Sequence, residues 1–146
     1  MSDDEGTSKR AVQGARPDVK VADDAGTIGT RAKEVDSLIA RQQFKDAVMC
    51  AIKDPPIGSK NQDAKDTNYR TVLKALNAVK EVDIRPVVDQ IHKTQGELGT
   101  DVLMKYALRG LADADSCGTL LKFHAAIVDV AGLGPIVRAM TDRKTV

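Results

Sequence analysis

Apolar residues recur at helical spacing through most of the chain after Thr30. The first run is Ala32, Val35, Leu38 and Ile39, and the second is Phe44, Ala47, Val48, Ala51 and Ile52. Spacings of three and four residues place each run on one face of a helix. Two prolines follow Asp54 and end the second run, because proline breaks helical hydrogen bonding and restricts the residue before it. The pattern predicts two short amphipathic helices.

The segment from Lys53 to Lys65 contains Gly-Ser-Lys, which raises the question of a phosphate-binding loop. Such a loop needs G-x-x-x-x-G-K-[ST] after a buried strand, whereas this segment has one glycine and follows a predicted helix. Ser59 and Gln62 instead have the spacing of a capping box, and Asp63 adds negative charge at the helix start. We therefore predict that Ser59 caps a third helix. Its apolar stripe is Tyr69, Val72, Leu73, Leu76 and Val79.

A fourth helix is predicted after this stripe. Asp83 is its expected N-cap, and Pro86 falls in its first turn, where a missing amide hydrogen costs little. Its apolar face is Ile84, Val87, Val88 and Ile91. Gly96 and Gly99 then predict a break in the helix.

Capping residues and glycines predict three more helices towards the end of the sequence. Thr100 is the expected cap of a fifth helix that ends near Gly110, and Asp115 or Ser116 opens a sixth. A last short helix is predicted from Ile136 to Thr141, and its length makes it dependent on docking.

No segment has the alternating pattern of a convincing strand. The predicted fold is therefore all-α, with about seven short helices arranged as successive helical hairpins in an α-α superhelix, over residues 30–146. Residues 1–29 carry few apolar side chains and are predicted to form an extended or flexible N-terminal arm. A tail without a role of its own is the alternative.

Composition narrows the function classes. The 146 residues carry a formal net charge of +1 and only 3% aromatic residues, without tryptophan. The net charge is too small to attract nucleic acid, and the aromatic residues are too few to stack on its bases, so a nucleic-acid partner is not expected. No apolar run is long enough to cross a bilayer, and the polar N-terminus lacks the apolar region of a signal peptide. We expect a soluble, cytosolic protein with no membrane partner, whose Cys50 and Cys117 are reduced.

Catalytic residues are not expected in this sequence. Cys117 and His124 lie seven residues apart, which separates them by about 10 Å along a helix and is too far for a nucleophile and its base. His92 and His124 lie on apolar helices, and no Glu or Cys stands at a metal-ligand spacing from them. We predict no enzyme activity, no cofactor and no metal site.

Four ordered blocks resemble a known family. They are KDPPIGSKNQDAKD (53–66), DVLMKYALRGL (101–111), LLKFHAAI (120–127) and GPIVRAMTDRKTV (134–146). Together they resemble subunit 5 of the actin-related protein 2/3 complex, a family that ends in a closely similar Ile-Val-Arg and Thr-Val pattern. The resemblance implies a non-catalytic helical subunit of an assembly that nucleates and branches actin filaments in the cytoplasm, within cortical actin networks of the cytoskeleton.

The resemblance also implies partners. In that family the helical body docks on subunit 4 and near subunit 1, and the N-terminal arm tethers the second actin-related protein. Within the matching blocks we expect partner contacts from Met104, Tyr106, Arg138, Arg143, Lys144 and Val146. A place in the core is the alternative for Met104 and Tyr106, and a solvated basic tail is the alternative for the rest.

The arm differs from the arm of animal relatives, which carries aromatic residues. Nothing before Phe44 is aromatic here. We therefore expect Val19 and Val21 to make smaller contacts with the second actin-related protein in place of aromatic anchors.

A general helical adaptor that binds a partner helix in a groove, outside the actin machinery, is the alternative function.

Overall fold

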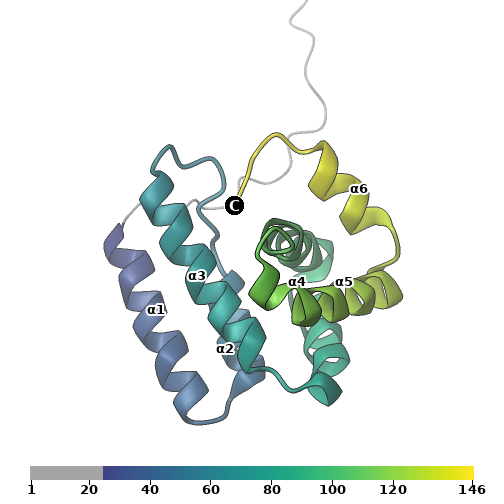
Figure 1. Ribbon diagram of the computed structural model, residues 1–146, viewed down its shortest axis with the longest axis horizontal. Coiled ribbons are helices and arrows are strands. Elements are labelled where there is room, and N and C mark those ends of the chain that lie inside the picture. Colours follow the sequence, from purple (N-terminus) through teal and green to yellow (C-terminus); the bar gives the residue numbers. More distant parts are fainter. Residues whose placement is uncertain (1–24) are drawn as a thin grey trace, which may run out of the picture.

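The computed structural model describes residues 25–146, which form the helical body in Figure 1. Its elements are α1 (Ala25–Ala40), α2 (Phe44–Ile52), α3 (Gln62–Ala78), α4 (Glu81–Gly110), the short 3-10 turn η1 (Ala114–Ser116), α5 (Cys117–Ala131) and α6 (Gly134–Thr141). No strand occurs within these residues, so the predicted all-α class is confirmed. Val19 and Val21 lie outside the described residues.

The helices form two groups that meet at α4. The first three helices pack on one another, and α5 and α6 both pack on α4 (Figure 1). In the first group α1 and α3 run in the same direction, because Arg31 bonds Asn68 near their starts and Asp36 pairs with Lys74 further along. Apolar side chains from both groups share one core, including Leu76, Ile91, Leu103, Phe123 and Ile127.

Helix α1 begins earlier than the sequence pattern indicated. The predicted boundary at Thr30 lies inside α1, and residues 25–29 are helical. Gly26 and Gly29 lower the helical propensity of this stretch. Burial of Ile28, Arg31 and Val35 along one face supplies the packing that overrides this propensity.

The cap of α3 is Asn61, so the prediction of a capping box between Ser59 and Gln62 is wrong. The Asn61 side-chain oxygen accepts a hydrogen bond from the Ala64 amide at 3.2 Å. Ser59 instead accepts from the Asn61 amide at 3.1 Å and supports the turn before the helix. Asparagine is as good a cap as serine, and it stands closer to the first helical turn.

Helix α4 differs from its prediction at its start and at Thr100, whereas the predicted break is present at Gly96. It starts at Glu81 after Lys80, so Asp83 lies in the first turn and Pro86 in the second. The chain turns sharply at Gly96, where φ is 64° and ψ is −149°, a conformation that only glycine adopts readily. Thr100 does not cap a new helix, because the helix resumes directly after Gly96 and Thr100 bonds the Glu97 carbonyl within it. The predicted fourth and fifth helices are thus segments 81–95 and 97–110 of α4.

The remaining boundaries agree with the sequence pattern. Helix α4 ends at Gly110, Ser116 precedes α5, and α6 covers the predicted last helix with two more residues at its start. Among residues 25–146, no single helix is long and apolar enough to cross a membrane, although the bent pair of residues 114–131 and α6 meets that test together.

Candidate partner-binding surface

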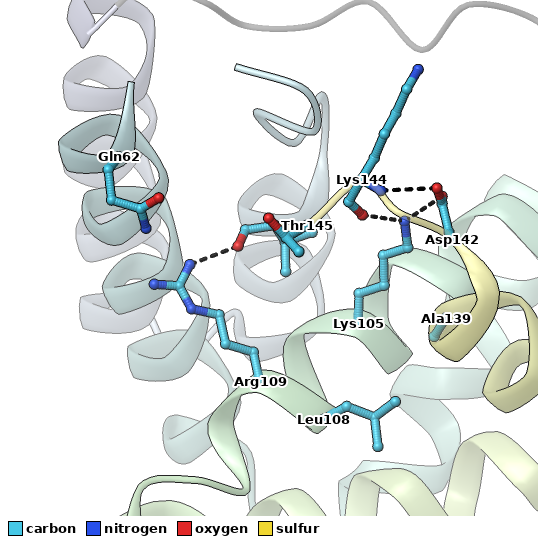
Figure 2. A pocket seen from close by; sticks show the side chains of 9 residues that line it. Gln62, Lys105, Leu108, Arg109, Ala139, Asp142, Lys144 and Thr145 are labelled. Atoms are coloured by element: carbon cyan, nitrogen blue, oxygen red, sulfur yellow. Dashed lines mark hydrogen bonds and ion pairs between the residues drawn. The ribbon is translucent and has the colours of Figure 1, made fainter. Parts of the chain in front are cut away.

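Residues 142–146 follow α6 and lie across α3 and α4, where three cationic side chains donate to their main-chain carbonyls. Figure 2 shows two of these side chains, Lys105 and Arg109. Lys65 donates to the Thr145 carbonyl at 3.0 Å, and Lys105 donates to the Lys144 carbonyl at 2.9 Å. Arg109 donates to the Val146 carbonyl at 2.7 Å. We call residues 142–146 with Lys65, Lys105 and Arg109 the C-terminal clasp.

Two further contacts fix this segment. Asp142 pairs with Lys105 at 2.6 Å, and the Asp142 carboxylate also accepts from the Lys144 amide at 3.0 Å (Figure 2). The Val146 side chain is 5% exposed and belongs to the hydrophobic core. The end of the sequence is therefore part of the packed body rather than a solvated tail.

Arg109 is the most connected cation of the clasp. It donates to Asp66 at 2.5 Å, and its guanidinium lies 4.3 Å from the centre of the Tyr69 ring. The hydrogen bond from Arg109, followed by one from Gln62, lowers the pKa of Asp66 below its ordinary value. Tyr69 in turn donates to Asp113, and burial together with that carboxylate raises the pKa of Tyr69 to about 12. One side chain thus connects α3, α4 and the clasp.

A hollow of about 370 Å³ lies beside the clasp. Leu108 and Ala139 supply apolar surface, and Gln62, Lys105 and Lys144 supply polar groups. Figure 2 shows the Lys144 side chain extending away from Leu108 and Lys105. The Lys144 ammonium has no carboxylate partner within the described residues.

Helix α6 exposes one apolar face. Leu133, Val137 and Met140 are 67%, 57% and 72% exposed, and their spacing of four and three residues places them on the same side of the helix. We call these three residues the α6 face. On another side, Arg138 forms a bidentate pair with Asp101 at 2.7 and 2.9 Å, which binds α6 to α4. This hydrogen bonding raises the pKa of Arg138.

The structure places two of the predicted contact residues inside the subunit. Met104 is fully buried and Tyr106 is 1% exposed, so the core alternative holds for both and neither has surface to offer a partner. The Tyr106 hydroxyl accepts from Asn68 at 2.5 Å, and Arg31 donates to the Asn68 side-chain oxygen at 3.0 Å. We call Arg31, Asn68 and Tyr106 the core link. Burial is the main reason that the pKa of Tyr106 rises to about 12.

The other four predicted contact residues lie within the last nine positions of the sequence: Arg138, Arg143, Lys144 and Val146. Arg138 and Val146 are engaged within the subunit, whereas the Arg143 and Lys144 side chains are exposed and form no ion pair among residues 25–146. Sequence reasoning missed Lys65, Lys105 and Arg109. A signal for the last two was present, because they stand four residues apart on one helix face.

Catalytic chemistry gains no support from the thiols or histidines. Burial, followed by the nearby Glu34 carboxylate, raises the pKa of Cys50, which is the opposite of what a reactive thiolate requires. No group of three His, Cys, Asp or Glu side chains that could hold a metal ion occurs within residues 25–146.

Comparison with known proteins shows the family of this chain. The family model described as ARP2/3 complex 16 kDa subunit (p16-Arc) matches residues 3–146. The chain is 39% identical over 123 residues to actin-related protein 2/3 complex subunit 5-C of Xenopus laevis, which covers 83% of this chain and 79% of the relative. It is 34% identical over 119 residues to subunit 5 of Dictyostelium discoideum, with 82% and 83% covered. The chain belongs to the family of the 16 kDa subunit of the ARP2/3 complex.

Proposed function

We propose that this protein is a non-catalytic structural subunit of the actin-related protein 2/3 complex that supports actin filament nucleation and branching. Its helical body docks on subunit 4 and near subunit 1, and residues before Ala25 tether the second actin-related protein. It acts in the cytoplasm, at cortical actin networks of the cytoskeleton. The α6 face is the observation that carries the docking part of this proposal.

The α6 face supports docking because it leaves three large apolar side chains in water on one side of a short helix. Grouped apolar side chains on a surface mark interaction sites more often than scattered ones do. A chain from a family of complex subunits has neighbouring proteins to cover such a face. Arg143 and Lys144 lie close in sequence to the α6 face and supply exposed positive charge, which suits an acidic rim on the partner.

The first experiment is purification of the tagged chain from its native cytosol, followed by mass spectrometry and a pyrene-actin assembly assay. The tag precedes residue 1, so that the clasp is left unchanged. Recovery of both actin-related proteins with stimulated nucleation is the expected result. Recovery with unrelated partners alone would instead favour a general helical adaptor.

The docking face is tested by Val137→Asp, with Val82→Asp as a matched control. Both valines are exposed helix residues, at 57% and 80%, so neither change disturbs the core. We expect Val137→Asp to reduce recovery of the other subunits about tenfold or more, because a charge buried in an apolar interface lacks a partner. Val82→Asp should leave recovery unchanged. Equal recovery of both variants would exclude the α6 face.

The basic residues are tested by the double variant Arg143→Glu, Lys144→Glu. If they pair with carboxylates of a neighbouring subunit, charge reversal lowers recovery of the complex at low salt. Added salt then lowers recovery of the variant complex less than that of the wild-type complex, because it screens a repulsion instead of an attraction. Assembly with unchanged salt sensitivity would contradict this pairing.

The tether is tested by deleting residues 1–24. The deletion stops there because Ala25 and the residues after it belong to α1. We expect lower occupancy of the second actin-related protein, with subunits 4 and 1 retained. Substituting Val19 and Val21 by Ser in the full chain separates the contribution of these two side chains from that of the segment.

A further inference from the structure

Helix α6 buries too little surface to fix its own position. It has eight residues, of which Pro135 alone is buried, and Ile136 and Ala139 pack against the core only in part. Helices this short are marginal without tertiary contacts. The orientation of the α6 face therefore depends on contacts that α6 and the residues after it make with α4.

These contacts form a regular series. Asp101 pairs with Arg138, Lys105 pairs with Asp142, and Arg109 bonds the Val146 carbonyl. On α4 the three residues follow one another at intervals of four, so they lie on one face of the segment 97–110. Their partners also follow at intervals of four, and each pair is separated by 37 positions in the sequence. We call the three pairs the ladder.

The middle pair connects the helix to the clasp. Asp142 is the C-cap of α6, and its amide bonds the Arg138 carbonyl at 3.1 Å. Its carboxylate is held by Lys105, whose side chain is only 10% exposed. Fixing the cap residue of α6 to α4 fixes the last turn of the helix, where Met140 of the α6 face lies.

We infer that the ladder is a positioning element that holds α6 and residues 142–146 against α4 as one cooperative unit, and that opening this unit removes the docking face. This inference rests on the proposed function for its consequence in the complex. Its physical basis is independent of that function. The segment has two buried side chains, Pro135 and Val146, and its polar contacts are partly exposed, so it should open at lower free energy than the packed core.

Hydrogen exchange of the full-length chain tests the ladder. Asp142→Asn removes the ionic part of the middle pair, and Asp142→Lys places two cations together. We expect amide exchange in α6 and residues 143–146 to accelerate about tenfold in the first variant and more in the second, with α1, α2 and α3 unchanged. Asp129→Asn is the matched control, because it breaks the exposed ion pair with Arg85 and should leave α6 exchange unchanged.

The outcomes separate the ladder from the docking proposal. Unchanged α6 exchange in both Asp142 variants would overturn the ladder, and so would an acceleration spread evenly over all helices. Faster α6 exchange with poorer recovery of the complex supports the ladder and its role in docking. If α6 exchange is faster and recovery of the complex is undiminished, the ladder is supported as a folding element. The same result overturns its role in docking and counts against docking through the α6 face.

Discussion

The core link and the C-terminal clasp both join α3 to α4, but they differ in exposure at Asn68 and Tyr106 of the core link and at Arg109 of the clasp. In the core link, Asn68 is fully buried and Tyr106 nearly so. In the clasp, the Arg109 side chain is 28% exposed and its partner Asp66 is 40% exposed. A broken core link leaves polar groups without any partner, whereas water can solvate the groups of a broken clasp. We therefore expect the contacts of the core link to stay formed as long as the chain is folded, and the contacts of the clasp to open reversibly within the folded chain.

The largest effect is expected when the core link is broken. Asn68→Ala removes the hydrogen bonds of Asn68 to both Arg31 and Tyr106. Leaving a buried cation and a buried hydroxyl with fewer partners should lower the free energy of unfolding by about 3 kcal/mol or more. Urea denaturation measures this loss. Asn77→Ala is the control, because Asn77 is an exposed residue of the same helix and its side chain donates to Ser116 at 3.0 Å, outside the core link. A loss of similar size there would remove the distinction.

A smaller loss of stability is expected from substitution of Gly96, whose backbone conformation sets the direction of the segment of α4 that carries residues of both the core link and the clasp. Gly96 turns α4, and the segment after it carries Tyr106 towards the core and Lys105 and Arg109 towards the clasp. Gly96→Ala forces a side chain into a backbone conformation that costs about 1–3 kcal/mol. Thermal unfolding should show this loss, whereas Gly118→Ala in the helical, open site on α5 should not.

A substitution that raises the helical propensity of α1, the helix of Arg31, should stabilise the fold on the side of the core link and leave the contacts of the clasp unchanged. Gly29 is helical, and a Cβ atom added there meets nothing within 4 Å. Gly29→Ala should raise the free energy of unfolding by about 0.5–1 kcal/mol, because alanine loses less backbone entropy on folding. The same change at Gly132, where φ is 73°, should lower stability instead. A destabilising Gly29→Ala would argue against a helix that starts at Ala25.

The smallest effect is expected from acid acting on the clasp. The pKa of Asp66 is lower in the folded chain than in the unfolded one, chiefly because Arg109 bonds the carboxylate. Its stabilising contribution is thus complete above the ordinary aspartate pKa, about 3.9, and is lost as the pH falls below it. We expect wild type to be more stable than Asp66→Asn at neutral pH and this difference to shrink in acid. A constant difference across that range would contradict the ionic contact.

Much of the fold is predictable from the sequence, because long apolar stripes at helical spacing need no tertiary information. The sequence predictions are wrong where tertiary packing or the φ angle of one residue determines whether the chain is helical. Residues 25–29 contain glycines that disfavour a helix, yet burial of Ile28 holds them in one. Gly96 and Gly99 look alike in sequence, but only Gly96 adopts a positive φ, and Gly99 stays helical.

The candidate surface is less predictable, because contacts across the ladder join residues 37 positions apart. No local pattern indicates that Lys105 faces Asp142. Nor does sequence distinguish an apolar residue of the core from one at an interface, which is why Met104 and Tyr106 were expected at a partner contact. For the α6 face, the predicted last helix includes Val137 and Met140 but not Leu133. The structure was needed for the place of Leu133 at the N-cap of α6 and for the exposure of all three side chains.

One of the two tyrosines belongs to the core link and the other contacts Arg109 of the clasp, and the chain has no tryptophan. Tyr106 lies in the core link, and Tyr69 lies under the Arg109 guanidinium at the clasp. Ultraviolet emission of the chain therefore comes from two chromophores, one at each connection. Tyr69→Phe leaves a signal that reports only on the core, and Tyr106→Phe leaves one that reports only on the clasp. The molecule thus contains its own pair of optical reporters, which can follow closure at the two places separately without an added dye.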